Sequence, residues 1–254
     1  MSDEIAKVEG ISKWTWLIKS IIYLVLYFII TQPMYLIVSE IHIRPPTTLF
    51  TPIDYMIPFV SFFVIFYVFL FYPVVIFTMG YFAFINPKRF DKVFLSILLI
   101  YMVAYINYII FPVMMIRPDP ASLPPDFLSQ VMAYYYMKDP PLNCFPSLHA
   151  ASATYVAYWL SREKPKYKIA FWLFAFLVML STLFVRQHVI VDEIYGFLLA
   201  YVACWFADYK AENLPFLSYV KEKTVPKDFM NIRIAVMLFL ASLTSALIVY
   251  SYVP

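Results

Sequence analysis

The chain has 254 residues, of which 63% are hydrophobic and 20% aromatic, and only 14% carry a charge at neutral pH. This apolar share is far above that of a soluble domain, so the composition excludes a soluble globular protein. A net charge of only +3 gives no reason to expect a nucleic-acid partner. Because several apolar blocks reach the roughly 20 residues that cross a bilayer, we expect an all-α, polytopic transmembrane helix bundle.

Seven apolar blocks follow one another along the chain, and we expect them to form one integral membrane domain, residues 1–254. They are Trp14–Val38, Tyr55–Ile85, Val93–Ile116, Ser147–Leu160, Tyr167–Val185, Val189–Phe206 and Ile234–Val253. The second block contains Pro58, Pro73 and Gly80, so we expect it to bend or to lie along the interface at one end. The first block is too long for the apolar part of a cleaved signal peptide.

Lysine and arginine predict the orientation of the bundle. If the N-terminus is cytoplasmic, all but four of the 19 basic residues fall in the inner segments; the four exceptions are Arg44, Arg117, Lys138 and Arg186. The positive-inside rule favours this orientation. We therefore expect a multi-pass protein of the cell membrane with a cytoplasmic N-terminus.

The longest outer connection runs from Arg117 to Pro146 and is rich in proline at both ends. Between the prolines, apolar residues recur at helical spacing from Phe127 to Met137. This pattern predicts an amphipathic helix that lies at the membrane interface, either as a plain surface helix or as a gate for substrate.

Two short polar clusters flank the apolar blocks and hold two of the three histidines in the chain. The first is Pro146-Ser147-Leu148-His149, and the second is Arg186-Gln187-His188 followed by Asp192. In the predicted topology both clusters reach the outer face, together with Arg117. Ionisable residues inside a membrane protein are costly and are usually kept for function.

The chemistry of these side chains suits phosphoryl transfer. His188 and Asp192 are one helical turn apart, so the carboxylate can accept from Nδ1–H and leave Nε2 free to attack phosphorus. His149, with an ordinary histidine pKa of about 6.5, can give a proton to the leaving group. His188, His149 and Asp192 are therefore the predicted catalytic residues.

Phosphoryl transfer also needs positive charge around the equatorial oxygens. Arg117 and Arg186 are predicted to bind phosphate, together with Ser147 at a helix N-terminus. The sequence has neither the carboxylate cluster that binds Mg²⁺ nor the ligand spacing of a zinc site, so we expect no metal and no cofactor.

Each feature also has a plainer interpretation. A histidine at the interface is often structural, an i,i+4 His–Asp pair is often only a satisfied hydrogen bond, and Arg117 can simply extend its charge toward water. A transporter for anionic head groups is a further alternative, but transporter sites tend to lie near the midplane between internal repeats. We find no internal repeat in this sequence.

The clusters resemble the motifs of the type 2 phosphatidic acid phosphatase superfamily of integral membrane enzymes. That family carries Lys-x6-Arg-Pro, Pro-Ser-x-His and Ser-Arg-x5-His-x3-Asp. In this chain the matching residues are Arg117 and Pro118; Pro146, Ser147 and His149; and Ser181, His188 and Asp192. The resemblance covers roughly residues 85–205 and implies a six-helix core at about 85–207, with an added seventh helix at about 234–253.

The resemblance implies that His188 forms a phosphohistidine, oriented by Asp192, and that His149 protonates the leaving alcohol and then activates water. It also implies that Arg117 and Ser147 bind the phosphate. Two positions depart from the pattern: Ile110 stands in place of the first-motif lysine, and Thr182 in place of the third-motif arginine. Since Arg186 lies one turn after Thr182, we expect its guanidinium to take over that contact.

The expected function is hydrolysis of a lipid phosphomonoester or pyrophosphate, of the phosphatidate or isoprenyl diphosphate class, at the outer leaflet. The partners implied are the lipid phosphate substrate and the bilayer; oligomeric state is left open. One alternative is a lipid phosphotransferase. Ser181-Thr182 with Arg186-Gln187-His188, together with Asp54 and Ile57-Pro58-Phe59 upstream, look similar to the inositolphosphotransferase-like branch, whose members pass the phospho-head group to a lipid hydroxyl. A non-catalytic lipid-phosphate binder or transporter is the remaining alternative.

Overall fold

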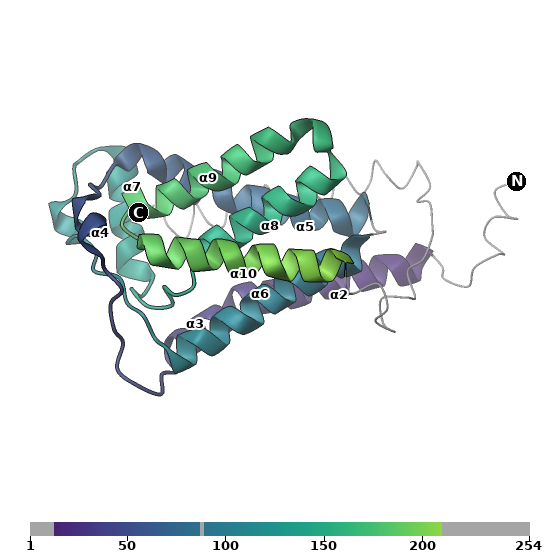
Figure 1. Cartoon of the computed structure of the whole chain (residues 1–254), viewed down its shortest axis with the longest axis horizontal. Coiled ribbons are helices and arrows are strands. Elements are labelled where there is room, and N and C mark those ends of the chain that lie inside the picture. The colour runs from purple at the N-terminus through teal and green to yellow at the C-terminus, as the bar shows by residue number, and fades with distance from the viewer. Residues whose placement is uncertain (1–12, 87–88, 210–254) are drawn as a thin grey trace, which may run out of the picture.

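The computed structural model describes residues 13–86 and 89–209, and its regular elements are helices. In chain order they are α2 (Lys13–Thr31), α3 (Pro33–Ser39), α4 (Pro52–Met56), η1 (Ser61–Phe63), η2 (Ile65–Leu70), α5 (Phe71–Phe84), α6 (Phe90–Ile110), η4 (Pro120–Ser122), α7 (Phe127–Lys138), α8 (Leu148–Glu163), η5 (Pro165–Tyr167), α9 (Lys168–Phe184) and α10 (Ile190–Tyr209). The long helices lie side by side in one bundle (Figure 1). The predicted all-α class is confirmed.

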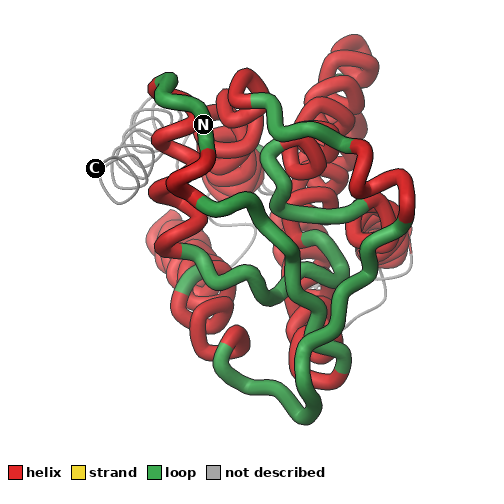
Figure 2. Tube along the Cα trace, turned by 90° about the vertical axis from the view of Figure 1, so that its left-hand side faces the viewer, coloured by secondary structure: helices red, strands yellow, loops and turns green. Residues whose placement is uncertain are grey.

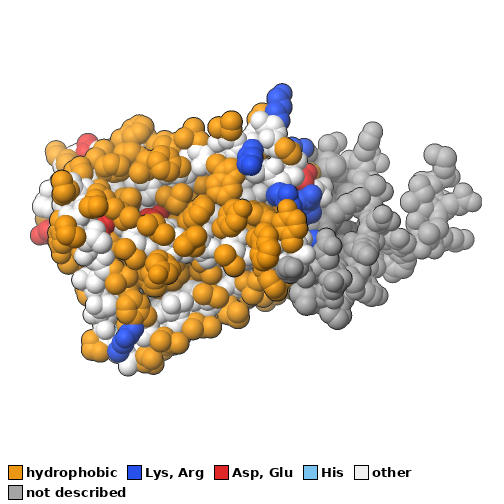
Figure 3. All heavy atoms as spheres, viewed as in Figure 1, with side chains coloured by type: hydrophobic (Ala, Val, Ile, Leu, Met, Phe, Trp, Pro, Cys, Tyr) orange, Lys and Arg blue, Asp and Glu red, His pale blue; other side chains and the backbone are white. Residues whose placement is uncertain are grey.

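Five helical segments in these ranges are long and apolar enough to cross a membrane. They are Ser20–Ser39, Ser61–Phe84, Phe90–Ile110, Pro165–Phe184 and Ile190–Tyr209. Apolar side chains cover the visible flank of the bundle along the helices (Figure 3). The chain is therefore a membrane protein. The predicted block Ile234–Val253 lies outside the described residues.

Prolines account for the differences between the predicted blocks and the helices. The first block is divided where α2 ends and Pro33 begins α3. The second block overlaps the end of α4, is interrupted around Pro58, and continues as a helix from Ser61, where it includes the π-helical segment η2. The third ends at Ile110 rather than Ile116, because Pro112 disfavours the helical conformation at Phe111.

Helix α8 lies at the centre of the bundle and packs against α5, α6, α9 and α10. Of its 16 residues, 13 are buried. Small side chains such as those of Ala150, Ala153 and Ala157 allow its neighbours to approach closely. The indole Nε1 of Trp159 donates to Ser96 Oγ at 2.9 Å, which satisfies a buried polar atom in the middle of the core. This central position holds both ends of α8 in place.

One end of the bundle gathers the features that the sequence analysis singled out. Helices α8 and α10 begin there and α9 ends there, with α4 and α7 beside them (Figure 1). Looking onto this end, irregular segments cover the helix ends (Figure 2). Backbone hydrogen bonds join these segments: Met115 N–H donates to Pro141 O at 2.8 Å, and Thr47 N–H donates to Pro112 O at 3.0 Å.

The predicted helix at Phe127–Met137 is present as α7, which begins where Asp126 accepts from Ser129 N–H at 3.0 Å. One face of α7 packs on the bundle end, where it forms a cluster with residues of η2 and the end of α9. The buried members of this cluster are Val64, Tyr67, Val68, Leu123, Val131, Met132, Ala133, Tyr135, Tyr136 and Val185. Helix α7 therefore lies beside the residues of both polar clusters.

Gly196 of α10 lies directly against the start of α8. A Cβ added there would stand 2.3 Å from Ser147 O and 3.0 Å from Ala150 Cβ. We expect Gly196→Ala to force the two helix starts apart, with a cost of about 1–3 kcal/mol and a large loss of activity. The melting temperature in detergent measures the first effect. Leu198→Ala, on the exposed side of α10, is the control, and equal stability of the two variants would contradict the prediction.

Candidate active site

The first polar cluster forms the start of α8. Ser147 is its N-cap, where Oγ accepts from Ala150 N–H at 3.1 Å. The backbone N–H of Ser147 donates to Asp192 O of α10 at 3.1 Å. The hydroxyl of Tyr108 donates to Pro146 O at 2.8 Å, so α6 also holds this segment. The result is a fixed position for His149, in the first turn of α8.

The second cluster forms the turn between α9 and α10. The backbone N–H groups of Gln187 and His188 donate to Thr182 O at 2.9 and 3.3 Å. Arg186 has a φ of 53°, which reverses the chain after α9. The hydroxyl of Tyr136 on α7 donates to Val185 O at 2.5 Å. The turn that carries His188 is thus held by backbone and side-chain bonds.

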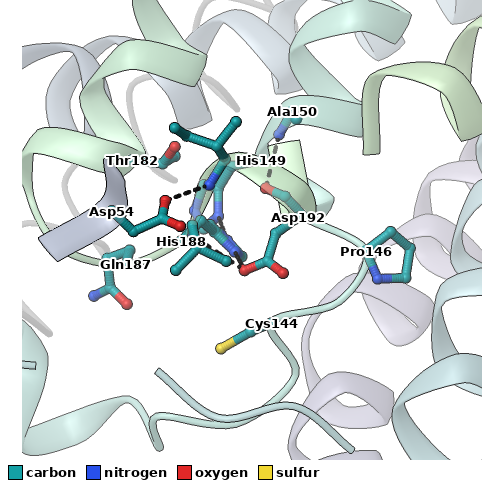
Figure 4. Close-up of polar contacts among 12 residues, drawn as sticks. Asp54, Cys144, Pro146, His149, Ala150, Thr182, Gln187, His188 and Asp192 are labelled. Carbon is teal, nitrogen blue, oxygen red and sulfur yellow. Dashed lines mark hydrogen bonds and ion pairs between the residues drawn. The ribbon is translucent and has the colours of Figure 1, made fainter. Parts of the chain in front are cut away.

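The two histidines meet at this end of the bundle (Figure 4). His149 Nδ1 lies 3.3 Å from His188 Nε2, and His188 Nδ1 lies 3.4 Å from Asp192 Oδ2. The same Oδ2 accepts from Val189 N–H at 3.2 Å, which fixes the carboxylate. The structure therefore brings the three predicted catalytic residues together, with Asp192 on one nitrogen of His188 and His149 at the other.

The surroundings of the histidines are largely apolar. The rings of Tyr67 and Phe71 lie 4.6 and 4.8 Å from the His149 ring, centroid to centroid. His188 lies in the turn outside the spanning segments, and burial, with a further contribution from Arg117, lowers its pKa to about 3. At pH 7 its imidazole is neutral, as a nucleophile must be.

Arg117 lies beside the histidines and is almost fully buried. Its Nη1 donates to Asp139 O at 2.6 Å, its Nη2 forms an ion pair with Asp139 Oδ2 at 2.8 Å, and Nη2 also donates to Gln187 Oε1. Burial raises the pKa of the Asp139 carboxyl, and Arg117 opposes that rise. Asp139 could not be predicted from the sequence, because its contact with Arg117 depends on how the long outer connection folds.

The Arg186 guanidinium contacts the segment around α4. Its Nη1 donates to the carbonyl oxygens of Asp54 and Ile57 at 2.6 and 3.1 Å. The expected contact of Arg186 with phosphate therefore stays a prediction, while the contact that the structure shows is a structural one. Thr182 is buried and donates to Met179 O, and Ile110, in place of the family lysine, is half exposed at the end of α6.

Asp54 is a residue whose part in this site was not predicted. It is buried, its Oδ2 accepts from Thr51 N–H at 2.8 Å, and its Oδ1 accepts from Ile190 N–H at 2.9 Å, at the first residue of α10 (Figure 4). The local pattern Thr-x-x-Asp signals a helix cap. The bond to Ile190 joins residues far apart in the sequence, so no local pattern indicates it.

We expect Asp54→Ala to destabilise the start of α10 by about 0.5–2 kcal/mol, because an N–H donor loses its cap. Asp54→Asn retains an oxygen for Ile190 and should keep most of the stability and activity. Thermal unfolding in detergent, run beside a turnover assay, measures both. The idea fails if the alanine and asparagine variants behave alike.

Several polar atoms of the site are buried and have no hydrogen-bond partner among the described residues. They include Arg117 Nε, Gln187 Nε2, His149 Nε2 and Asp192 Oδ1. Glu193 is also buried, and its carboxylate lies near the hydroxyls of Ser147 and Thr182 without a hydrogen bond of ordinary geometry. Buried polar atoms normally have partners, so this cluster of exceptions indicates where a polar ligand binds.

A metal centre receives no support from the side chains in the described ranges. Among these residues, no group of three or more His, Cys, Asp or Glu side chains is placed to hold a metal ion. The donors gathered at the bundle end are nitrogen atoms of arginine, glutamine and histidine, which suit an anionic oxygen.

Comparison with known proteins gives one match. A family model described as the PAP2 superfamily matches residues 92–216. Searches of curated proteins and of solved structures returned no match. The matched range contains both polar clusters and Arg117.

Proposed function

Because the chain belongs to the PAP2 superfamily, whose activity is of the phosphatase type on phosphoesters, we propose that it is a membrane lipid phosphatase. The observation that carries the proposal is the contact of His149 Nδ1 with His188 Nε2 at 3.3 Å, with Asp192 on the far nitrogen of His188. This is the arrangement of a nucleophile, its orienting carboxylate and a neighbouring acid.

In the first step, the Nε2 lone pair of His188 attacks phosphorus while the bond to the leaving oxygen breaks. His149 gives a proton to that oxygen and releases the alcohol. Asp192 accepts from His188 Nδ1–H and stabilises the positive charge that forms on the ring. Since His149 Nδ1 and His188 Nε2 lie 3.3 Å apart, a phosphoryl group attacked by His188 must enter between the two rings or move them apart.

In the second step, water attacks the phosphorus of the phosphohistidine. His149, now neutral, takes a proton from that water, and the phosphorus–nitrogen bond breaks. The products are phosphate and the free His188. These steps use only side chains of this chain and need no cofactor, and we propose a metal-independent reaction on that basis.

The substrate class follows from the membrane setting. We propose a lipid phosphomonoester or pyrophosphate, of the phosphatidate or isoprenyl diphosphate class, because the site lies at one end of a bundle whose flank is apolar. A lipid can then present its head group at the bundle end while its chains stay in the bilayer. Phosphate binding is assigned to Arg117, Ser147 and, as predicted from sequence, Arg186.

We further propose that residues 1–254 form a single membrane domain with a catalytic core at about 85–207. On the face seen in Figure 3, most of the visible Lys and Arg side chains lie at the end of the bundle opposite the site. This distribution supports a cytoplasmic placement of that end by the positive-inside rule. The site would then face the periplasm, the lumen or the exterior.

A lipid phosphotransferase is the second candidate, and the reduced positive charge of the site favours it. The family lysine is replaced by Ile110 and the family arginine by Thr182, while Arg117 is already paired with Asp139. With less positive charge, the site suits a phosphodiester with one negative charge better than a doubly charged phosphomonoester. A lipid hydroxyl would replace water in the second step.

One assay separates the candidates. Detergent-solubilised protein is given a lipid phosphomonoester, a lipid pyrophosphate or a lipid phosphodiester, each with and without an added lipid alcohol. Free phosphate formed from a monoester or pyrophosphate supports the phosphatase. A new phospholipid that appears only with the alcohol supports the transferase, and turnover of none of these substrates would contradict both.

A further inference from the structure

We propose that Gln187 binds a phosphate oxygen of the substrate through its side-chain NH₂ group and, with Arg117, forms the phosphate cradle of this chain. The proposal rests on the proposed function, since it concerns the same site. It assigns to Gln187 part of the contact that Ile110 and Thr182 no longer provide. In the structure the Arg186 guanidinium donates to the carbonyl oxygens of Asp54 and Ile57, so Gln187 would add to the contacts already proposed.

The backbone places Gln187 directly beside the reacting groups. It precedes His188 in the turn, and its N–H donates to Thr182 O at 2.9 Å, which anchors the residue to the end of α9. The side chain is only 3% exposed, so it lies inside the bundle end. Figure 4 shows it extending from the turn that carries His188.

The orientation of the Gln187 amide follows from its neighbour. Arg117 has only donors, so the atom that faces its Nη2 must be the oxygen Oε1. The NH₂ group is therefore turned away from Arg117, and Nε2 is buried without a partner among the described residues. A buried donor without an acceptor is costly, and at a binding site it is explained by an acceptor that the ligand supplies.

A second unpartnered donor belongs to Arg117, the residue that contacts the Gln187 side chain. The Nε of Arg117 is also buried without a partner, although both Nη atoms donate hydrogen bonds. Arg117 is close enough to His149 and His188 to affect the protonation of His188. Because Gln187 precedes His188 in the same turn, a phosphoryl oxygen bound by Gln187 Nε2 and Arg117 Nε would lie beside the nucleophile.

The choice of an amide has a consequence for the substrate. An amide donates hydrogen bonds without adding positive charge, whereas the lysine and arginine of the family pattern add two charges. The nearest cation, Arg117, is paired with Asp139. Gln187 therefore favours a phosphate group that carries one negative charge over one that carries two.

The test measures phosphate binding without turnover. The melting temperature of the detergent-solubilised full chain is recorded over a series of inorganic phosphate concentrations, with sodium chloride at matched ionic strength as the reference. A ligand that binds only the folded state raises this temperature by an amount that grows with the logarithm of 1 + [L]/Kd, so the concentration dependence reports Kd. Four proteins are compared: the wild type, Gln187→Glu, Gln187→Met and Gln130→Leu. Gln130 is an exposed residue of α7 that donates to Pro124 O.

Gln187→Glu and Gln187→Met together separate binding from structure. Gln187→Glu keeps an acceptor for Arg117 and strengthens that contact, so a purely structural role predicts equal or higher stability. Its added negative charge repels phosphate under either role, so the uncharged Gln187→Met variant decides whether the donors bind phosphate. The proposal predicts a loss of the phosphate-dependent rise. Gln187→Met removes the donors without adding charge and should weaken phosphate binding about tenfold, the usual effect of one lost charge-assisted hydrogen bond. Gln130→Leu should respond as the wild type does.

The proposal is overturned if Gln187→Glu or Gln187→Met keeps the wild-type response to phosphate, or if the wild type shows no response at all. Its failure can be told apart from that of the proposed function. If both variants turn over substrate with an unchanged KM, the role of Gln187 is wrong, while the proposed enzymatic function stands. If phosphate binding depends on Gln187 but no substrate is turned over, the role of Gln187 in binding stands, while the proposed enzymatic function is wrong.

Discussion

His188→Gln is expected to lower turnover of the lipid phosphate by at least about 10⁴-fold, because it removes the atom that forms the bond to phosphorus. Glutamine is close in size to histidine and keeps a donor for Asp192, which limits the structural damage. Phosphate release in detergent measures the loss.

The matched control is His42→Gln, at the one histidine outside the two clusters. It should retain wild-type turnover. The assignment of His188 would be wrong if its glutamine variant kept more than a few per cent of the activity while its melting temperature matched that of the wild type.

His149→Gln is expected to lower turnover of an alkyl phosphate about 10²- to 10⁴-fold, the usual contribution of general acid–base catalysis. The loss should depend on the leaving group. An aryl phosphate whose phenolate leaves without a proton should form the phosphoenzyme at a rate close to that of the wild type.

The second step of that variant should remain slow, because water then has no base. The predicted result is a burst of one phenolate per protein followed by slow turnover. An equal loss for alkyl and aryl substrates, with no burst, would remove His149 from the role of acid. In that case, His149 would only pack against Tyr67 and Phe71.

The sequence predicted those parts of the site that depend on helical spacing and on topology. His188 and Asp192 are one turn apart, and the order of the apolar blocks brings His149 to the same end of the bundle. Both relations are present in the structure. The end of α6 was predicted wrongly at Ile116; the helix ends at Ile110, because Pro112 restricts the residue before it.

The remaining contacts depend on tertiary structure. The Arg186 guanidinium contacts carbonyl oxygens of the segment around α4, and Asp54 caps α10 from the same segment. These partners are more than a hundred residues apart, so local spacing does not indicate them. The orientation of the Gln187 amide could not be predicted from the sequence either, because it depends on the position of Arg117.

The most direct test of the central claim is to find where the phosphoryl group goes. Protein caught during turnover of a lipid phosphate labelled on phosphorus is quenched under alkaline conditions, digested and examined by mass spectrometry. We predict label on the peptide that contains His188, and none on that peptide in His188→Gln. Turnover of the wild type without a labelled intermediate, or label on another residue, would contradict the assignment of His188 as the nucleophile.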